Sequence, residues 1–476
     1  MAELSTYRAK RRAGKTPEPI PSGPVEAESD DRFVIQEHHA RALHWDFRLE
    51  RQGVLVSWAV PKGLPADRKT RRLAVRTEDH PLDYADFEGE IPHGEYGGGS
   101  VSVWDRGRYD LEKWSDREIM VVLHGERVDG RYVLIHTGGN QWLVHRMDDP
   151  ADPAFEPLPE LVRPMLATAG PLPRADDEYG FEFKWDGIRA ICYVDGGRIR
   201  LLTRNDRDVT VSYPELRALG EAIGARPVVL DGEIVAFGDD GVPSFGALQE
   251  RMHVMEPAKA RRGAQRTPVV YLAFDVLHLD GRSTVRLAYE ERRALLDGLG
   301  LAGTHWQAPP WFRGGGAAVL AAADQQRLEG VVAKRLGSVY QPGRRSSEWI
   351  KVKHTRTQEV VVVGWTPGQG RRQSSLGALL LAVPRQGELR YAGKVGTGFS
   401  DAVLDDLGRT LAPLERADPP VPGPLPRAQI AGARWVQPRL VGEVTFTEWT
   451  REQRLRHPSW RGLRPDKNAG DVVVED

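Results

Sequence analysis

A group of histidines and acids near the N-terminus has the composition of a metal site. His38 precedes the run HWDFRLE, in which His44 and Asp46 are two residues apart. Alternate residues of a β-strand point to one face, so His44, Asp46 and Arg48 would share one side of an extended segment. Two imidazoles and a carboxylate suit Mn²⁺ or Zn²⁺. The alternative is a binding module whose histidines are structural or simply lie on the surface.

A lysine in the middle of the chain lies where a nucleophile would be well placed. Lys184 begins the run KWDGIR, directly after the strand-like segment FEF. Taken alone, it is equally explained as an edge-strand lysine whose amine reaches water. Four later segments change this interpretation, because they add cations and carboxylates in a fixed order. These segments are Thr203-Arg204-Asn205, LDGEI with Glu233, Glu329 in EGVVAK, and WIKVK with Lys351 and Lys353.

These residue types fit a covalent reaction at phosphorus. A lysine amine must be neutral to attack an α-phosphate, and neighbouring cations or a bound metal lower a lysine pKa. Lys351 and Lys353 are two residues apart, so they share one face of a strand. They would both supply this positive charge and neutralise phosphates.

The ordered motifs KxDGxR, RN, DGE, EGVVAK and KVK resemble the covalent nucleotidyltransferase superfamily, which holds ATP-dependent DNA ligases, RNA ligases and mRNA-capping enzymes. The resemblance implies that Lys184 forms a lysyl-AMP phosphoramidate and that Glu233 and Glu329 are oxygen ligands of Mg²⁺ or Mn²⁺. Phe274, within YLAFDVLHLDG, is equally explained as a core aromatic. The nucleotide contacts that the resemblance implies are Glu182 and Phe274 at adenine, Arg189 and Arg204 at the sugar or a DNA phosphate, and Lys351 and Lys353 at the phosphates.

The N-terminal part carries a second resemblance. The runs FVIQEHHARALHWDFRLE, SWAVPKG and EDHPLDYADFEGEIPHGEYGGG are very similar to the 3′-phosphoesterase domain of bacterial non-homologous end-joining ligases. A metal and an arginine would stabilise charge on a phosphoryl group. The resemblance implies Mn²⁺ at His38, His44 and Asp46, phosphate at Arg48, His80 and Tyr84, and weaker candidates in Lys62, Arg72 and Glu18.

The first 27 residues predict a flexible arm. A basic cluster precedes PEPIPSGP, and this composition is typical of a mobile terminus. The family's arm carries a basic–acidic pair near this point, whereas the run KRRA lacks the acid, so no role is predicted for it. The basic residues of the arm are Arg8, Lys10, Arg11, Arg12 and Lys15.

The C-terminal stretch combines aromatic and basic side chains. FTEWT is followed by RLRHPSWRGLRPDK, and a solvated terminal arm is the alternative explanation. The stretch resembles the last motif of the superfamily, which orients the pyrophosphate of ATP, and it is especially similar to the end-joining DNA ligases. The predicted phosphate contacts are Arg456, Arg461, Arg464 and Lys467, with Arg371 and Arg372 of the loop GQGRRQSS as further candidates.

Three folded units would position these residues. Short apolar or alternating runs from Arg32 predict a β-barrel or β-sandwich. A Pro- and acid-rich linker separates it from mixed strands and helices, which predict an α+β nucleotidyltransferase (adenylation) domain. Short strands with glycine turns then predict a small β-barrel, an OB-fold. The predicted boundaries are 1–27 for the arm, 28–150 for the phosphoesterase-like domain, 151–160 for the linker, 161–357 for the adenylation domain and 358–476 for the OB-fold domain.

Composition limits the class of protein. The 476 residues contain no apolar run of about 18 residues and no signal-peptide-like start, so neither a membrane protein nor a secreted one is expected. The single Cys192 excludes an intrachain disulfide and favours the reducing cytoplasm. The net charge of −1 hides a division along the chain. Residues 1–160 carry 22 basic and 29 acidic side chains, residues 161–360 carry 28 and 25, and the remainder carries 16 and 13.

The expected function is that of an ATP-dependent DNA ligase with a 3′-end-trimming domain, acting as a monomer on broken duplex DNA in the nucleoid. A Ku-type end-binding partner is implied by the resemblance. The largest family members also carry a primase-like polymerase domain, for which the three units leave no room. One alternative is an RNA ligase or another nucleotidyltransferase, among which capping enzymes use GTP. A second is a DNA-end-binding scaffold with an inactive N-terminal domain.

Overall fold

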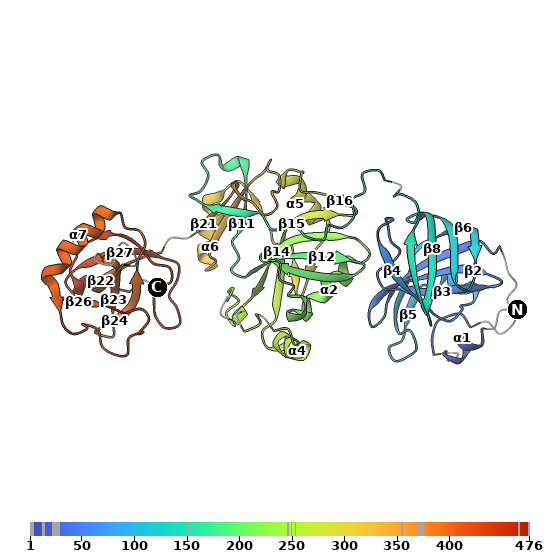
Figure 1. Cartoon of the computed structure of the whole chain (residues 1–476), viewed down its shortest axis with the longest axis horizontal. Helices are drawn as coiled ribbons and strands as arrows, with labels where there is room; N and C mark the ends of the chain where they lie inside the picture. The colour runs from blue at the N-terminus through green and yellow to red at the C-terminus, as the bar shows by residue number, and fades with distance from the viewer. Residues whose placement is uncertain are drawn as a thin grey trace. The chain divides into compact units, whose positions relative to one another are not determined.

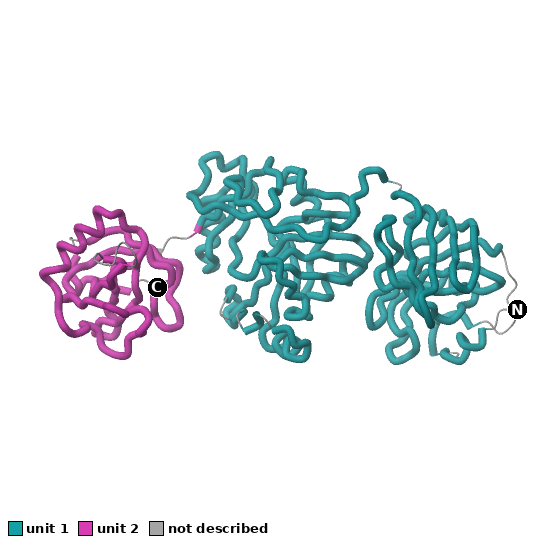
Figure 2. The backbone as a smooth tube through the Cα atoms, viewed as in Figure 1, with its two compact units in different colours: residues 1–352 teal, residues 353–476 magenta. Residues whose placement is uncertain are grey.

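The computed structural model divides the chain into two compact units, residues 1–352 and 353–476 (Figure 2). The first unit contains a β-barrel followed by an α+β part, and the second is a smaller β unit with one long helix (Figure 1). These three folds confirm the predicted architecture. The structure describes residues 4–11, 15–20, 29–150, 152–244, 247–248, 250–252, 254–353, 356–368, 376–464 and 467–474.

The N-terminal strands close into a barrel. Their order is β1-β2-β3-β4-β9-β8-β7-β6, and β1 pairs with β6 as well as with β2, so the ring of eight strands has no free edge; β5 is added beside β6. Because the sheet closes on itself, the N-terminal domain is a β-barrel and not a β-sandwich, the two folds that the sequence left open. The strands are β1 (Arg32–His39), β2 (Leu43–Arg51), β3 (Val54–Val60), β4 (Arg71–Arg76), β5 (Gly89–Ile91), β6 (Gly99–Trp114), β7 (Glu118–Gly125), β8 (Asp129–Gly138) and β9 (Gln141–Arg146).

In strand β2 of the first hairpin, odd-numbered and even-numbered residues face opposite sides of the barrel wall. The odd-numbered Trp45, Phe47 and Leu49 of β2 pack in the hydrophobic core of the barrel. The even-numbered residues of the same strand are polar and share the other face, as the period of two of a strand requires. The short helix α1 (Ser5–Ala9) and the 3₁₀-helix η1 (Leu82–Asp86) contribute further buried residues.

Two sheets face each other in the α+β part. The five-stranded sheet has the order β10-β21-β20-β11-β19, and the other has the order β13-β12-β14-β15-β18-β17 with β16 beside β15. Met165, Ile191 and Trp349 belong to one buried cluster, which joins the sheets. The strands are β10 (Leu166–Ala169), β11 (Tyr179–Phe183), β12 (Ile188–Asp195), β13 (Arg198–Thr203), β14 (Val228–Ala236), β15 (Val269–Leu279), β16 (Arg282–Ser283), β17 (Ala302–Gly303), β18 (Trp306–Gln307), β19 (Phe312–Arg313), β20 (Gly330–Arg335) and β21 (Arg345–Lys353).

Helices cover the outer faces of these sheets. Val319 and Ala323 of α6 pack with residues of β11 and β20, while Leu296 of α5 packs on the core of the larger sheet. Among the described residues, no helix has the length and apolar character needed to cross a bilayer. The helices are α2 (Arg217–Ile223), α4 (Pro257–Arg266), α5 (Tyr289–Gly298) and α6 (Gly316–Gln325), with 3₁₀-turns η2 (Asp176–Glu178), η3 (Thr210–Ser212) and η4 (Pro214–Leu216).

The C-terminal unit is built on the apolar run EVVVVGW. Val360 and Val362 pack in one cluster and Val361 and Val363 in another, so this strand is covered on both faces. Its sheet runs β24-β23-β22-β26-β25, and β27 joins β22 to β28. The elements are β22 (Arg356–Pro367), β23 (Leu376–Arg385), β24 (Glu388–Val395), α7 (Asp401–Leu411), η6 (Ala412–Leu414), β25 (Glu415–Arg416), β26 (Arg434–Val436), β27 (Val441–Phe446), β28 (Ser459–Leu463) and η7 (Ala469–Asp471).

Candidate functional site

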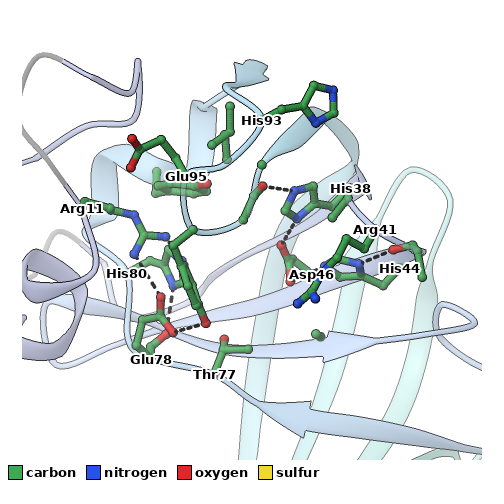
Figure 3. Close-up of a pocket in the computed structure, with 18 of the residues that line it drawn as sticks. Arg11, His38, Arg41, His44, Asp46, Thr77, Glu78, His80, His93 and Glu95 are labelled. Carbon is green, nitrogen blue, oxygen red and sulfur yellow. Dashed lines mark hydrogen bonds and ion pairs between the residues drawn. The ribbon is translucent and has the colours of Figure 1, made fainter.

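The β1–β2 hairpin brings two histidines and an aspartate together. In its register His38 lies opposite His44, and Asp46 is two residues further along β2. His38 Nδ1 is 3.4 Å from Asp46 Oδ2, and His44 Nε2 is 3.7 Å from Asp46 Oδ1. One potential ligand atom from each residue lies within 4.8 Å of the others. Figure 3 shows the three side chains converging at one side of the pocket.

Backbone carbonyls fix which ring nitrogens of the two histidines are available. His38 Nε2 donates to the carbonyl of Gly97 at 2.7 Å, and His44 Nδ1 donates to that of Ala42 at 2.9 Å. A carbonyl only accepts, so these two nitrogens carry protons, and the opposite nitrogens, which are nearest Asp46, are the ones placed to bind a metal. Metal-bound histidines show this same outer contact. The donor set therefore fits a divalent metal.

A buried arginine keeps the carboxylate of this group ionised. Arg48 is 1% exposed and donates from Nη2 to Asp46 Oδ2 at 2.9 Å. Burial alone would raise the pKa of Asp46, but Arg48, His38 and His44 hold that pKa well below its usual value. Arg48 also donates to Gln36 Oε1 and to Ser57 Oγ, so its plane is fixed. A fixed guanidinium beside a metal site is suited to hold a phosphate.

His80 stands between two guanidinium groups. Arg48 Nη1 is 2.9 Å from His80 Nδ1, and Arg11 Nη2 is 3.3 Å from His80 Nε2. Burial and the charges of Arg48 and Arg11 lower the pKa of His80 well below its usual value, so the ring is neutral near pH 7. A neutral imidazole has one acceptor nitrogen, so only one arginine can donate to it at a time.

The N-terminal segment differs from the predicted flexible arm, because its described residues close one side of this pocket. Arg11 is 9% exposed and donates from Nε to Glu18 Oε1 at 2.8 Å and from Nη1 to Glu78 Oε1 at 3.0 Å. Its guanidinium lies 3.7 Å from the centroid of the Tyr7 ring, and Tyr84 donates its hydroxyl to Glu18 at 3.1 Å. Packing and these ion pairs order the segment. Arg12 lies outside the described residues.

Arg11 is thus a pocket residue that the sequence did not reveal. No acid lies next to the basic run, and the acid that pairs with Arg11 is Glu18, seven residues later. The cavity has a volume of about 650 Å³ and is lined by all six residues predicted for metal and phosphate. Lys62 and Arg72 do not line it. His93 lines the cavity, but its ring points away from the three metal-site residues (Figure 3).

A second cavity, of about 250 Å³, lies between the two sheets of the α+β part. Lys184 directly follows Phe183, the last residue of β11, and its side chain lines this cavity. A hydrogen bond from its backbone N–H to the carbonyl of Gly330 holds the residue in place. Gly187 allows the turn, because a Cβ there would lie 2.3 Å from the carbonyl oxygen of Ile234. Predicted nucleotide-site residues that line the cavity are Glu182, Lys184, Arg189, Arg204, Glu233, Phe274 and Lys351.

The amine of Lys184 forms an ion pair with Glu329, the remaining predicted metal ligand. Glu233, on β14, also faces the cavity, and burial raises its pKa to about 8 although Arg189 and Lys184 act in the opposite direction. The side chain of Arg189 is itself locked, at 2.6 Å from both oxygens of Asp231. Near neutral pH, Glu233 is therefore a carboxyl group that favours a proton or another cation.

A second buried lysine lies beside the two residues predicted to contact adenine, Glu182 and Phe274. Lys334 is 1% exposed, forms a 2.8 Å ion pair with Glu182 and lies 4.5 Å from the centroid of the Phe274 ring. Burial lowers its pKa. Tyr289 donates its hydroxyl to Glu182 as well. Sequence reasoning left Lys334 without a role, and its signal was a lysine in the otherwise apolar strand GVVAK.

The remaining predicted residues lie elsewhere. Lys353 is two residues beyond Lys351 on β21, where the second unit begins, and it does not line the cavity. The basic residues of the C-terminal stretch belong to the second unit. Arg371 and Arg372 lie outside the described part of the chain. The 250 Å³ cavity therefore holds the predicted nucleophile, the two candidate adenine contacts and one of the two predicted phosphate lysines.

Sequence models of three protein families match successive parts of the chain. Residues 36–136 match the DNA Ligase D 3′-phosphoesterase domain, residues 164–353 the ATP dependent DNA ligase domain, and residues 372–467 the ATP dependent DNA ligase C terminal region. The crystallised ligase domain of LigD from M. tuberculosis is 44% identical, over 66% of this chain and 98% of that one, with a TM-score of 0.40. The chain belongs to the LigD family of DNA ligases. The sequence identity carries this assignment.

Full-length LigD proteins match along the same stretch. The multifunctional non-homologous end joining DNA repair protein LigD of Mycobacterium tuberculosis (strain ATCC 25618 / H37Rv) is 48% identical over 477 residues, which is 99% of this chain. LigD of Pseudomonas aeruginosa is 37% identical over 534 residues and again covers 99% of this chain. The chain spans 61% and 62% of the length of these two LigD relatives.

Proposed function

We propose that this chain is an ATP-dependent DNA ligase that joins broken DNA through a lysyl-AMP intermediate, and that its barrel trims 3′ ends beforehand. The observation that carries the ligase proposal is the cavity between the two sheets. It surrounds Lys184 with a glutamate and a lysine at one end, three arginines, and the carboxylates of Glu233 and Glu329. Membership of the LigD family supports DNA as the substrate.

The chemistry follows from the contents of this cavity. Lys184 Nζ, once its proton has passed to solvent, attacks the α-phosphorus of ATP, an N–P bond forms, and the bond to the bridging oxygen breaks as pyrophosphate leaves. AMP then passes to a 5′-phosphate at the DNA end, and a 3′-hydroxyl displaces AMP. Glu182 and Phe274 would hold adenine, with Lys351 at the phosphates. Glu233 and Glu329 would hold Mg²⁺ or Mn²⁺, which neutralises phosphate charge when bound.

The barrel has its own chemistry in this proposal. His38, His44 and Asp46 would hold Mn²⁺, which acts as a Lewis acid on the phosphate of the 3′ end when bound. Arg48, fixed by four side-chain contacts, would hold the same phosphate, and neutral His80 would donate to it or accept from it. We also propose a monomer that acts in the cytoplasm at the nucleoid with a Ku-type partner, on the basis of the family.

Labelling with ATP tests the ligase half directly. Incubation with α-labelled ATP and Mg²⁺ is expected to yield labelled protein, and Lys184→Ala is expected to yield none. Labelling by GTP in place of ATP would favour a capping-type nucleotidyltransferase. Absence of any adduct in the intact chain, or an undiminished adduct in Lys184→Ala, would remove the ligase proposal.

A primer with a 3′-phosphate or a 3′-ribonucleotide tests the barrel. Trimming is expected with Mn²⁺ and is expected to disappear in the double variant His44→Ala, Asp46→Ala. The matched control is His124→Ala with Asp110→Ala, a histidine–aspartate pair joined at 2.9 Å on the surface of the same barrel. Trimming that persists in the first double variant would place the active site elsewhere, and an inactive intact chain would favour the scaffold alternative.

A further inference from the structure

Two glutamates of the C-terminal unit lie directly opposite each other on neighbouring strands. Glu359 is on β22 and Glu443 on β27, and the antiparallel register pairs them. Like charges in this position repel and destabilise a sheet unless cations lie between them. We call these two residues the carboxylate pair.

The cations that relieve this repulsion come from the basic C-terminal stretch. Arg464 bridges the carboxylate pair, with Nη1 at 2.9 Å from Glu359 and 3.3 Å from Glu443. Arg461 Nη1 lies 2.9 Å from Glu443, and Lys467 Nζ lies 3.5 Å from Glu359. These three cations are among the residues that the sequence assigns to phosphate. In the structure they are bound to carboxylates of their own unit.

Exposure shows which partners are fixed and which can leave. The side chains of Glu359 and Glu443 are 13% and 21% exposed, whereas those of the three cations are between 32% and 55% exposed. The carboxylates lie on the strand face that carries Val361 and Val441 of a buried cluster. Flexible cationic side chains at the surface can turn toward a phosphate, while the carboxylates remain on the sheet.

The carboxylate pair can compete with a phosphate for the three cations because it offsets most of their charge. Three cations alone would present a charge of +3, but the carboxylate pair reduces the group to +1. A phosphate that binds Arg461, Arg464 and Lys467 must displace two negative charges from them. Surface ion pairs are weak, typically below about 1 kcal/mol each, so exchange with a phosphate is feasible.

We propose that the carboxylate pair is a built-in competitor that holds the phosphate-binding cations of the C-terminal unit until a phosphate replaces it. This inference rests on the proposed ligase function. The phosphate is either the triphosphate of ATP or a phosphate of the DNA backbone. Glu359 and Glu443 are positioning residues here, because they act through the arginines and the lysine.

The test uses the full chain with Glu359→Gln and Glu443→Gln, alone and combined. Glutamine keeps the size of the side chain and removes its charge. The first measurement is the rate of labelled adenylate formation at graded ATP concentrations, without DNA. The second is the Kd of the pre-adenylated protein for a nicked duplex. The matched control is Glu388→Gln, which neutralises a surface ion pair with Arg390 in the same unit.

Competition predicts tighter phosphate binding in the double variant. We expect the KM for ATP to fall about three- to tenfold with kcat changed less than about twofold, because two weak ion pairs no longer compete. If the cations serve DNA instead, the Kd for the nicked duplex falls by this factor while the KM stays constant. The single variants should show intermediate effects, and Glu388→Gln none.

Other outcomes overturn the proposal. A KM and a Kd that both stay constant would show that the carboxylate pair has only a structural role, and a rise in either would show that it orients the cations for phosphate. Thermal unfolding of each variant checks that the unit remains folded. If the double variant does not fold, the KM and Kd of the single variants decide. An intact chain that forms no adenylate at all contradicts the proposed function rather than this inference.

Discussion

The barrel pocket and the cavity of the α+β part both contain an arginine locked against an aspartate, but a buried acid in each has its pKa shifted in the opposite direction. In the barrel, Arg48 and two histidines lower the pKa of Asp46, so the carboxylate is ionised before any ligand arrives. In the cavity, Arg189 donates hydrogen bonds to Asp231, and burial raises the pKa of Glu233 to about 8. Asp46 of the first site is ionised in advance, whereas Glu233 of the second favours a proton or another cation near neutral pH.

This difference matches the two tasks that we propose. A hydrolytic site that meets only a metal and a phosphate can be fully built within one barrel. A nucleotide site that binds, reacts and releases at several stages gains from carboxylates whose charge depends on what is bound.

The largest expected effect separates the two sites. Lys184→Ala should lower adenylate formation and nick sealing at least about a thousandfold, because no other group replaces the nucleophile. Its 3′-trimming should stay within twofold of the intact chain. Asp46→Asn should show the reverse pattern in the same two assays. Loss of both activities in either variant would show that the sites are coupled, and the comparison would fail.

The next effect concerns the completeness of the barrel pocket. Arg11→Ala should lower the trimming rate about 10- to 100-fold, because a buried guanidinium that faces His80 and two glutamates is removed. The matched control is Arg8→Ala, an exposed arginine three residues earlier whose loss should have little effect. Equal rates in both variants would mean that the N-terminal segment only covers the pocket.

A smaller effect is expected in the pH dependence of stability. The pKa of Glu233 is near 4.5 in the unfolded chain and about 8 in the fold, so the folded state holds a proton that the unfolded state has released. This contribution to stability is fully present below about pH 4.5 and is lost as the pH rises to 8. Glu233→Gln should therefore gain roughly 2–4 °C in Tm relative to the intact chain between pH 5 and 8.5.

This measurement is made in the presence of a chelator, by scanning calorimetry at several pH values. Glu290→Gln, at a half-exposed position of α5 paired with Arg313 at 3.2 Å, serves as the control and should follow the intact chain. A difference in Tm between Glu233→Gln and the intact chain that does not change with pH would show that Glu233 is already ionised, like Asp46.

The smallest effect concerns a single hydroxyl. Tyr84→Phe keeps the ring beside Arg48 but removes the 3.1 Å hydrogen bond to Glu18. It should cost about 0.5–1.5 kcal/mol in the free energy of unfolding, measured by urea denaturation. Trimming should fall less than tenfold if the pocket is held mainly by its ion pairs. A loss as large as that of Arg11→Ala would instead place the hydroxyl on the phosphate.

Sequence reasoning located what depends on local spacing. The period of two of a strand put His44, Asp46 and Arg48 on one face, and the family resemblance around Lys184 selected seven of the residues that line its cavity. The hairpin register that places His38 opposite His44 is also local, because the two strands are joined by a short turn.

The missed features depend on contacts between distant segments. Arg11 gains its role from Glu78, 67 residues away, and no feature of the run KRRA encodes that contact. Lys334 pairs with Glu182 across neighbouring strands β20 and β11. The pairing of Arg464 with the carboxylate pair depends on the register of β22 and β27. Such contacts follow from tertiary packing, which a single sequence shows only through family resemblance.

The closure of the barrel by the pairing of β1 with β6 has a further consequence for the crowded cell. An open sheet exposes a row of unpaired N–H and C=O groups to which a strand of another chain can add, and this is a common route to aggregation. The eight-stranded ring offers no such row; only the three-residue β5 extends beside it. The hairpin that carries His38, His44 and Asp46 is thereby bonded on both sides, and its polar face is protected from the misassembly to which an edge hairpin is exposed.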